Sequence, residues 1–302
     1  MKLRYLLTGL LAAAALALAA DVPDDYAAEI ETWRADRLAR LKAPDGYLNL
    51  AGLFWLEAGV YSFGGDAGND LVFPGAADAE MGSFTVASDG SVRMTVRPGV
   101  DVRVNNEAVT RVLLPDDTED EFLRATYGSL AWIVINREGK IGIRLHDLKS
   151  RALTELPPIP YYDIDPGLRV VATLKRFDEP RVLNVGTVVD GLPYNPVSPG
   201  VVEFEVGGMT HTLEAYESGE RLFFVFGDRT SGRETYGAGR FVYAAKPGDD
   251  DRTVLDFNQS YNPPCVFNDF STCPVASPRN RLKVRIEAGE KYDKSLYFGD
   301  SD

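Results

Sequence analysis

The sequence predicts an all-β fold of two packed β-sandwich or barrel modules, preceded by one N-terminal α-helix. Hydrophobic residues recur at helical spacing near the start of the chain, in residues 24–42. From residue 47 onward, short apolar runs alternate with a period of two, and 28 Gly and 18 Pro among 302 residues supply turns between them. We find no alternation of strands with helices and no internal repeat, which argues against a parallel α/β sheet.

Residues 1–20 resemble a secretory signal peptide. Lys2 and Arg4 precede an apolar run, and Ala17 and Ala19 fit the small-x-small pattern that signal peptidase cleaves. The alternative is an uncleaved anchor, but the run falls short of the ~20 apolar residues of a spanning helix. No cysteine follows the run, which excludes a lipoprotein anchor. We expect a mature protein that is periplasmic or secreted and has no membrane span.

Residues 21–46 are predicted to form an N-terminal helical segment. Two aspartates at its start and basic residues at its end suit the helix dipole, and the sequence Ala-Pro-Asp-Gly at 43–46 ends the helix in a turn. Its apolar stripe consists of Ile30, Trp33, Leu38 and Leu41. We expect this stripe to pack on the body of the protein, with a partner-binding helix as the alternative.

The rest of the chain is predicted to divide into modules at residues 47–155 and 156–302. The proline-rich stretch 156–160 is stiff and extended, and we interpret it as the joint between them. The glycine pair 207–208 between two alternating runs is typical of a two-residue hairpin turn. The expected strands are 92–96, 100–104, 130–135, 141–145, 201–206, 209–213, 222–226, 241–243, 254–257 and 282–286.

The charge balance argues against two classes of partner. Lys and Arg number 32 and Asp and Glu number 45, which gives a net charge of −13. Because the chain has no basic run, the phosphate backbone of nucleic acids and anionic membrane surfaces would repel it. The sequence lacks the G-x-S-x-G, P-loop and H-E-x-x-H motifs. We interpret His146 as a hydrogen-bonded loop residue and His211 as a surface strand residue. Whether the protein is an enzyme stays open, and we assign no catalytic residue and no cofactor.

Cys265 and Cys273 are the two cysteines of the chain. In an oxidising compartment the default for such a pair is a structural disulfide. It would stabilise the fold by roughly 2–3 kcal/mol on the chain-entropy model. Two buried free thiols, or a redox or metal-binding pair, are the alternatives. No histidine lies nearby, so we assign no metal site.

The densest polar segment spans residues 228–262. Asp256 lies at the end of an apolar run and needs a partner if it is buried. Arg240 is our candidate, because its planar guanidinium matches a carboxylate. The alternative is a pocket in which Arg240 holds an anionic ligand while Asp228, Glu234 and Asp256 supply carboxylates. Oxygen ligands of this kind also suit Ca²⁺.

Several longer motifs carry a resemblance to a known family. They include Trp33-x-x-x-Arg37-x-x-Arg40-Leu41-x-x-Pro44-Asp45-Gly46-Tyr47-Leu48, Thr230-Ser231-Gly232-x-Glu234-Thr235-Tyr236-Gly237-Ala238-Gly239-Arg240-Phe241 and Leu255-Asp256-Phe257-Asn258-x-x-Tyr261-Asn262-Pro263-Pro264-Cys265. Together they resemble the bacterial and archaeal domain of unknown function family 1684. The resemblance covers roughly residues 30–292 and includes both cysteines. It implies no activity, because the family has none assigned.

The first β module also resembles a forkhead-associated domain. The stretches 63–66, 69–72 and 102–106 are similar to the strand-and-loop pattern of that family. Forkhead-associated domains recognise phosphothreonine, but their Ser-x-x-His element is replaced here by Gly82-Ser83-Phe84-Thr85. The resemblance therefore implies a β-sandwich, and the replaced element argues against phosphopeptide recognition.

The leading functional hypothesis is a non-enzymatic ligand-binding or envelope-maintenance protein, whose partner is an unknown small molecule or an envelope protein. One alternative is a hydrolase or lyase that uses Asp or Glu as acid and base on a polar substrate. Another is a structural protein-interaction module led by the first β module. The candidate ligand-binding residues are Asp228, Ser231, Glu234, Tyr236, Arg240, Asp256, Asn258, Tyr261, Asn262 and Arg281.

Overall fold

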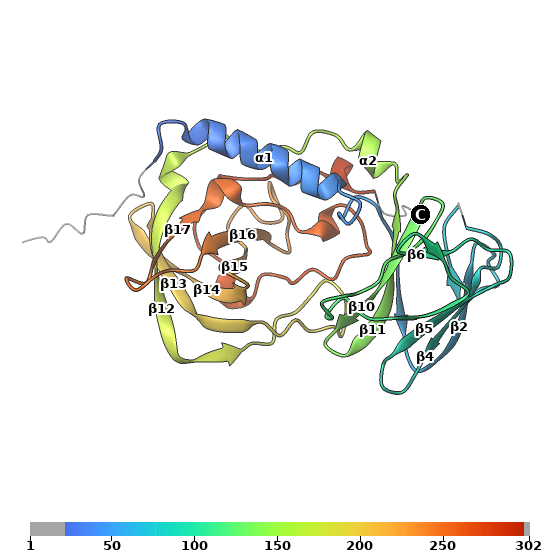
Figure 1. Ribbon diagram of the computed structural model, residues 1–302. Helices are drawn as coiled ribbons and strands as arrows, with labels where there is room; N and C mark the ends of the chain where they lie inside the picture. The colour runs from blue at the N-terminus through green and yellow to red at the C-terminus, as the bar shows by residue number, and fades with distance from the viewer. Residues whose placement is uncertain (1–21, 76, 299–302) are drawn as a thin grey trace, which may run out of the picture.

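The computed structural model describes residues 22–75 and 77–298, and it confirms the mostly β architecture with an N-terminal helix (Figure 1). Helix α1 (Tyr26–Lys42) precedes three β-sheets, and a short second helix, α2 (Ala152–Glu155), lies between the modules in sequence. The expected signal peptide at residues 1–20 lies outside the described residues. In the part of the chain that is described, no helix has the length and apolar character to cross a bilayer.

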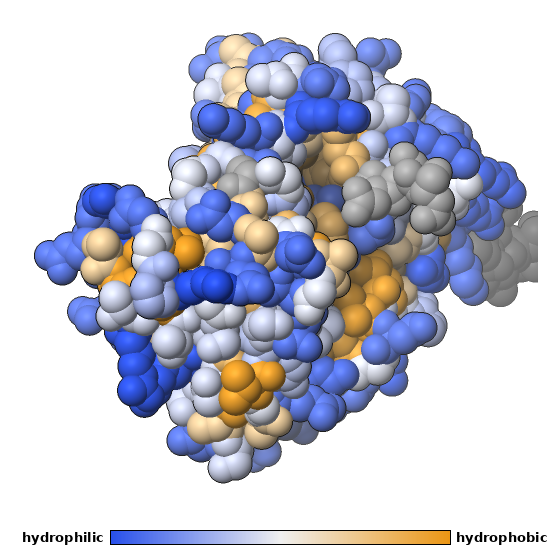
Figure 2. Space-filling view, turned by 90° about the vertical axis from the view of Figure 1, so that its right-hand side faces the viewer, coloured by the Kyte–Doolittle hydropathy of each residue, from blue (hydrophilic) through white to orange (hydrophobic). Residues whose placement is uncertain are grey.

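The first module is a sandwich of two sheets around one hydrophobic core. One sheet has the order β1 (Leu50–Leu56), β11 (Lys140–Asp147), β10 (Leu130–Arg137), β9 (Ala125–Tyr127), β6 (Arg103–Val104) and β7 (Glu107–Ala108). The other has the order β3 (Leu71–Val72), β2 (Gly59–Gly64), β4 (Gly82–Val86), β5 (Val92–Val96) and β8 (Arg111–Leu114). Phe63, Phe73, Phe84 and Trp132 lie in this core, with neighbouring ring centroids 4.5–5.9 Å apart. Figure 2 shows that the surface at this end of the molecule is largely hydrophilic, with smaller hydrophobic patches.

The second module is a six-stranded antiparallel sheet that curls toward a barrel. Its order is β16 (Arg240–Ala245), β15 (Arg221–Phe226), β14 (Met209–Ser218), β13 (Val197–Val206), β12 (Arg169–Val182) and β17 (Arg252–Asp256). The edge strands β16 and β17 approach each other, so the sheet nearly closes. The predicted hairpin is confirmed: β13 and β14 are joined by Gly207 and Gly208, at φ of +61° and +73°.

Both faces of the second sheet are covered near its β15–β16 edge. Side chains alternate along a strand, so Leu222, Phe224 and Phe226 of β15 enter the core inside the curled sheet. Phe223 and Val225 enter a second cluster on the opposite face. This double burial explains why β15 reads as a continuous apolar run rather than an alternating one.

Helix α1 runs across the second module (Figure 1). Ile30 and Leu41 are fully buried on its inner face. The Tyr26 hydroxyl donates to both carboxylate oxygens of Asp256, at 2.8 and 2.9 Å. Asp25 occupies the N-cap without a side-chain hydrogen bond, so tertiary contacts rather than capping fix the helix.

Two strand predictions were wrong in extent. Residues 282–286 form no strand: Leu282 and Val284 make single backbone hydrogen bonds to the loop at 227–229, and the Ile286 carbonyl accepts a hydrogen bond from the guanidinium of Arg240. The strand expected at 100–104 shortens to Arg103–Val104. Strand β12 was not predicted. Its first half alternates between buried and partly buried residues, but its second half is mostly exposed and polar, so the alternation covers only part of the strand.

Candidate functional site

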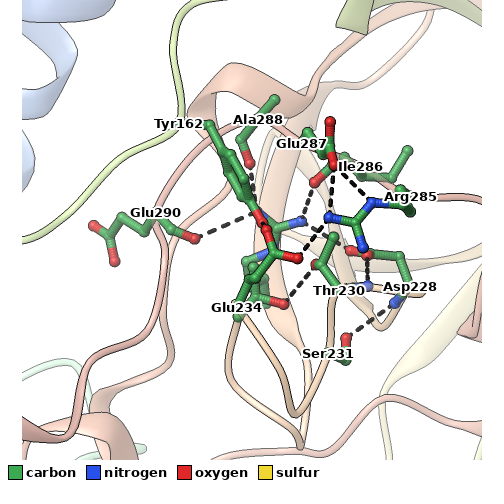
Figure 3. A network of polar contacts seen from close by, with 12 residues as sticks. Tyr162, Asp228, Thr230, Ser231, Glu234, Arg285, Ile286, Glu287, Ala288 and Glu290 are labelled. Atoms are coloured by element: carbon green, nitrogen blue, oxygen red, sulfur yellow. Dashed lines mark hydrogen bonds and ion pairs between the residues drawn. The ribbon is translucent and has the colours of Figure 1, made fainter.

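Arg240 belongs to a buried structural network rather than a ligand site, and its partners Asp228, Ile286, Ala288 and Glu290 are labelled in Figure 3. The side chain is 1% exposed. Its Nη2 donates to Asp228 Oδ2 and to the Ile286 carbonyl, both at 2.8 Å, and its Nη1 donates to the carbonyls of Ala288 and Glu290. Burial lowers the pKa of Arg240, and the neighbouring Asp228 carboxylate opposes that change. Because the side chain is almost fully buried, the guanidinium is closed to an anion from solvent.

The expected Arg240–Asp256 pair is therefore wrong. Arg240 is the first residue of β16, and its side chain binds Asp228 in the loop after β15. Asp256 is the last residue of β17, and its side chain binds Tyr26 at the start of α1. Asp256 accepts hydrogen bonds from Tyr26 and from the Asn258 backbone N–H. Burial raises the pKa of Asp256, and these hydrogen bonds limit the rise. Its polar partner comes from a helix 230 positions away, which local sequence patterns do not reveal.

The three carboxylates that were expected to share a pocket have separate partners. Asp228 binds Arg240, and Asp256 binds Tyr26. Glu234 pairs with Arg285 at 2.6 Å and accepts a hydrogen bond from a tyrosine hydroxyl at 2.9 Å (Figure 3). Among the described residues, no group of three or more His, Cys, Asp or Glu side chains is arranged to hold a metal ion. The structure does not assemble these carboxylates into one site.

The other residues expected at the ligand site also have structural roles, with one exception. Ser231 accepts a backbone hydrogen bond within its own loop. The side-chain amides of Asn258 and Asn262 donate to backbone carbonyls, and Arg281 is exposed beside a backbone glycine. The exception is Tyr261, which lines a pocket that the sequence did not predict.

This pocket opens between α1 and strands β15 and β16 and has a volume of about 530 Å³. That volume is within the range of small-ligand sites. Its lining combines three arginines with six aromatic rings, and we call it the arginine–aromatic pocket. It is lined by Trp33, Arg37, Arg40, Tyr47, Arg221, Phe223, Phe241, Tyr243, Gln259, Tyr261 and Pro264.

Helix α1 supplies one wall of the arginine–aromatic pocket. Trp33, Arg37 and Arg40 are spaced four and three residues apart, which places them on one helix face. Arg37 is buried and fixed: its Nη2 donates to the Asn262 carbonyl at 2.9 Å, and its Nε lies 3.3 Å from a carboxylate oxygen of Glu290. Arg40 is exposed.

Alternating residues of β15 and β16 supply the facing wall. Arg221 and Phe223 share a face of β15, and Phe241 and Tyr243 share the same face of β16, with Phe223 directly opposite Tyr243. The ring centroids of Phe223 lie 4.9 Å from those of both Phe241 and Tyr243. Tyr261 stacks on Tyr243 with an interplanar angle of 14°. The rings form a continuous aromatic surface.

Two guanidinium groups of the protein make cation–π contacts with this aromatic surface. The Arg37 guanidinium lies 4.4 Å from the centroid of the Tyr261 ring, and that of Arg221 lies 4.0 Å from the centroid of Tyr243. Burial raises the pKa of Tyr261, so its hydroxyl stays neutral. The tyrosines therefore act as neutral ring surfaces for positive or planar groups.

The arginine–aromatic pocket concentrates positive charge in an acidic chain. Its described lining contains no Asp or Glu. Arg37 has Glu290 as its partner, but Arg40 and Arg221 form no ion pair with a carboxylate of the described residues, and both are exposed. Two guanidinium groups are therefore available to an anion at this site.

Two other hollows offer less distinctive chemistry. One, of about 420 Å³, lies beside the β13–β14 turn, and its charges are balanced between two arginines and two glutamates. Another, of about 630 Å³, is bounded by acidic loops of the first module. Neither combines unpaired cations with a ring surface.

Cys265 and Cys273 lie at the edge of the arginine–aromatic pocket as free thiols, so the structure does not contain the expected disulfide. Cys273 is buried in the same cluster as Phe223 and Phe241, and Cys265 packs against that cluster. The backbone N–H of Cys265 donates to the Cys273 sulfur at 3.2 Å. The two thiols are neighbours in space.

Comparisons with known proteins support the family resemblance. The model of a family described as a protein of unknown function (DUF1684) matches residues 154–291, which include most of the second module. An uncharacterized protein of Haloarcula marismortui is 28% identical, over 45% of this chain and 77% of that one, with a TM-score of 0.39. The N-terminal forkhead-associated domain of S. cerevisiae Rad53, solved with a phosphothreonine peptide, is 12% identical over 30% of this chain and 68% of that one, with a TM-score of 0.19. No curated protein matches the sequence significantly. None of these similarities assigns an activity to this chain.

The sequence contained a partial signal for the arginine–aromatic pocket. Trp33, Arg37 and Arg40 stood in the first family motif, but we interpreted the arginines there as dipole partners at the helix end. The spacing of Trp33, Arg37 and Arg40, four and then three residues apart, places one aromatic residue and two cations on one helix face. This spacing was the signal from which that wall of the pocket could have been predicted. Arg221 and Tyr243 gave none, because the register of β15 and β16 is needed to bring them together.

Proposed function

We propose that the protein binds a small organic anion with a planar ring in the arginine–aromatic pocket. One observation carries the proposal: within residues 22–75 and 77–298, Arg40 and Arg221 have no carboxylate partner, and the ring-walled pocket that they line contains no Asp or Glu. In a chain of net charge −13, unpaired cations at such a site point to an anionic partner. The ligand-binding hypothesis is retained, and its site moves from Arg240 to this pocket.

The anionic part of the ligand is inferred from the guanidinium groups. A guanidinium presents parallel N–H donors that match the two oxygens of a carboxylate or phosphate. The neighbouring rings offer an apolar surface beside these exposed guanidinium groups. A ligand ring packed on it would exclude water and so strengthen the hydrogen bonds to the charged groups. Arg40 and Arg221 approach the pocket from α1 and β15, so a bound anion would join the helix to the sheet.

The planar part of the ligand is inferred from the aromatic wall. Phe223, Tyr243 and Trp33 line the pocket, and aromatic pairs contribute about 0.5–1.5 kcal/mol beyond area burial. Arg221 already lies over Tyr243. A planar ligand ring would extend that stack while its charged group stays near the guanidinium.

We also propose that the protein acts outside the cytoplasm, in the periplasm or as a secreted protein, after removal of residues 1–20. The support is the sequence of that segment. Intact-mass measurement of the protein isolated from its own cell envelope tests this. A mass that lacks the first 20 or so residues is expected, and retention of Met1 would contradict it.

Isothermal titration calorimetry with three matched probes tests the proposed ligand class. Phenyl phosphate carries both a ring and an anion, cyclohexyl phosphate keeps the anion without the planar ring, and benzyl alcohol keeps the ring without the charge. We expect phenyl phosphate to bind at least ~10-fold more tightly than benzyl alcohol, because hydrogen bonds to charged groups contribute about 1.5–3 kcal/mol. We expect cyclohexyl phosphate to fall between them.

Two results would contradict the proposal. If benzyl alcohol binds as tightly as phenyl phosphate, the arginines do not recognise the ligand. If none of the three probes binds to the folded protein, the pocket is not a site for small aromatic anions.

A further inference from the structure

The two thiols are adjacent but differ in access. Cys273 is 4% exposed, whereas Cys265 is partly exposed. The Cys265 sulfur accepts hydrogen bonds from the Cys273 thiol and from the Tyr236 hydroxyl. The Tyr236 ring packs edge-on against Tyr292, with centroids 5.4 Å apart. Cys265 is therefore the more exposed residue of the pair, and the buried Cys273 lies beside it.

This arrangement distinguishes the two thiols electrostatically. The hydrogen bond from Cys273, assisted by that from Tyr236, lowers the pKa of Cys265 against the opposing effect of burial. Burial, together with donation to Cys265, raises the pKa of Cys273. A more acidic thiol on the more exposed residue, beside a buried thiol, is the arrangement of an oxidisable cysteine with a resolving partner.

We propose that Cys265 and Cys273 form a reversible oxidation site, at which a hydroperoxide converts the two thiols into a disulfide that alters the arginine–aromatic pocket. The effect on the pocket rests on the proposed function, whereas the oxidation itself does not.

The chemistry balances in two steps. The Cys265 thiolate attacks an oxygen of the hydroperoxide, the O–O bond breaks, and the other oxygen leaves as an alcohol, or as water from hydrogen peroxide, with the thiol proton. Cys265 is then a sulfenic acid. The Cys273 sulfur attacks the Cys265 sulfur, the S–O bond breaks, and hydroxide leaves as water with the Cys273 proton. The two sulfurs lose two electrons, and the peroxide oxygens gain them. A thiol reductant reverses the bond by exchange.

The segment between the cysteines connects the oxidation site to the pocket at two points. Pro264, which lines the pocket, immediately precedes Cys265. Asn268, inside the segment, donates its side-chain N–H to the carbonyl of Tyr47 at 2.8 Å, and Tyr47 also lines the pocket. A disulfide requires the sulfurs to approach to about 2.05 Å, closer than a hydrogen-bonded pair. The ends of the segment must therefore move when the disulfide forms. This movement would displace Pro264 and Tyr47, the two pocket residues attached to the segment.

Mass spectrometry tests the oxidation site on the full mature protein. The reduced protein is treated with hydrogen peroxide, quenched, and measured under denaturing conditions. We expect a loss of roughly two hydrogens that localises to a Cys265–Cys273 peptide and is reversed by dithiothreitol. An unchanged mass, or oxygen addition at the cysteines without a bridge, would overturn the proposal.

Single variants test the assignment of roles. Cys273→Ser removes the resolving thiol, so the Cys265 sulfenic acid should persist and react with dimedone. Cys265→Ser leaves the buried thiol, which should react at least ~10-fold more slowly. If both variants react at the same rate, the assigned roles are wrong. Far-UV circular dichroism checks that both are folded, and the wild-type mass measurement stands without them.

Titration of phenyl phosphate into the reduced and oxidised proteins tests the link to the pocket. We expect the two dissociation constants to differ by ~5-fold or more. Equal affinities would overturn the link. If the reduced protein does not bind phenyl phosphate, the proposed function fails, while the mass measurement still decides whether the oxidation site exists.

Discussion

A buried guanidinium is stable only where carbonyls and carboxylates surround it, and Arg240 meets this requirement. Its charge is balanced by Asp228, whose side chain is 0% exposed, and three backbone carbonyls complete its surroundings. These carbonyls belong to Ile286, Ala288 and Glu290, so this side chain adds to the backbone hydrogen bonds that residues 289–291 make with residues 160–162 and with Ser260. Arg240 therefore acts as an internal clamp for the second module.

Replacement of Arg240 by methionine should destabilise the protein strongly. The variant leaves the Asp228 carboxylate buried without its charge partner and frees the carbonyls of residues 286–290. We expect a loss of about 3–5 kcal/mol in the free energy of unfolding, measured by urea denaturation. Arg93→Met, an exposed residue of β5, is the matched control and should change stability by less than ~0.5 kcal/mol. A loss below ~1 kcal/mol for Arg240→Met would contradict the clamp.

His146 is a buried structural histidine. It lies within β11 rather than in the loop where we expected it, and its Nδ1 lies 2.7 Å from Oδ1 of Asn49. The Asn49 amide N–H groups donate to two carbonyls, so its oxygen is the acceptor and His146 Nδ1 carries the hydrogen. Burial, and then the nearby charges of Arg124 and Arg144, lower the pKa of His146 from 6.5 to about 4.

This pKa predicts a loss of stability on acidification. Between pH 6.5 and 4 the unfolded chain binds a proton at His146 while the folded chain does not, so unfolding is favoured as pH falls. The contribution is complete above pH 6.5, and about 3 kcal/mol of it is lost by pH 4. His146→Asn removes the titration. Urea denaturation of both proteins from pH 7 to 4 should therefore show a steeper loss in the wild type, and parallel curves would contradict the assignment.

At the scale of single elements, the β13–β14 hairpin depends on backbone conformation alone. Gly208 has φ of +73°, and a Cβ built there meets no atom within 4 Å. Gly208→Val should therefore cost about 1–2 kcal/mol through backbone strain. Gly208→Asn should cost less, because asparagine adopts this conformation more readily. Chemical denaturation of the two variants measures the difference, and equal stabilities would show that the turn does not require positive φ.

The sequence predicted elements whose signal is local. Strand β5 and the hairpin at Gly207 and Gly208 follow from alternation and turn chemistry, and α1 follows from helical spacing. The sequence-based prediction failed where a side chain distant in sequence binds a backbone carbonyl that a neighbouring strand would otherwise bind. Residues 282–286 alternate like a strand, but Leu282 and Val284 bond to residues 227–229 in the loop after β15, and the Ile286 carbonyl accepts a hydrogen bond from Arg240.

The candidate site was harder to predict, because three separate segments build it: residues 33–47, 221–243 and 259–264. Tyr261 was the one predicted residue that lines the arginine–aromatic pocket. Helix α1 contributes Arg37 and Arg40, which lie outside the segment 154–291 that matches the family model. Polarity along the chain favoured Arg240 and Asp256, but Arg240 binds Asp228 inside the second module and Asp256 binds Tyr26 of α1. The sequence does not show which arginines pair with carboxylates. A site that consists of unpaired arginines can therefore be identified only from the structure.

At the scale of the whole molecule, charge is distributed unevenly. The chain carries a net charge of −13, yet the arginine–aromatic pocket has three arginines and no acidic residue in its described lining. The acidic surface disfavours nonspecific polyanions, whereas the pocket accepts a small anion whose charge lies close to the guanidinium groups. Selection by size and charge together follows from this distribution.

Isothermal titration calorimetry of phenyl phosphate against an Arg40→Gln/Arg221→Gln double variant tests the role of the unpaired arginines. Each guanidinium forms charge-assisted hydrogen bonds of about 1.5–3 kcal/mol, so removal of both should weaken binding by ~100-fold or more while the protein stays folded. Arg93→Gln, on the exposed face of β5 in the other module, should bind within ~2-fold of the wild type. If the double variant binds phenyl phosphate as tightly as the wild type, the arginine–aromatic pocket is not the anion site.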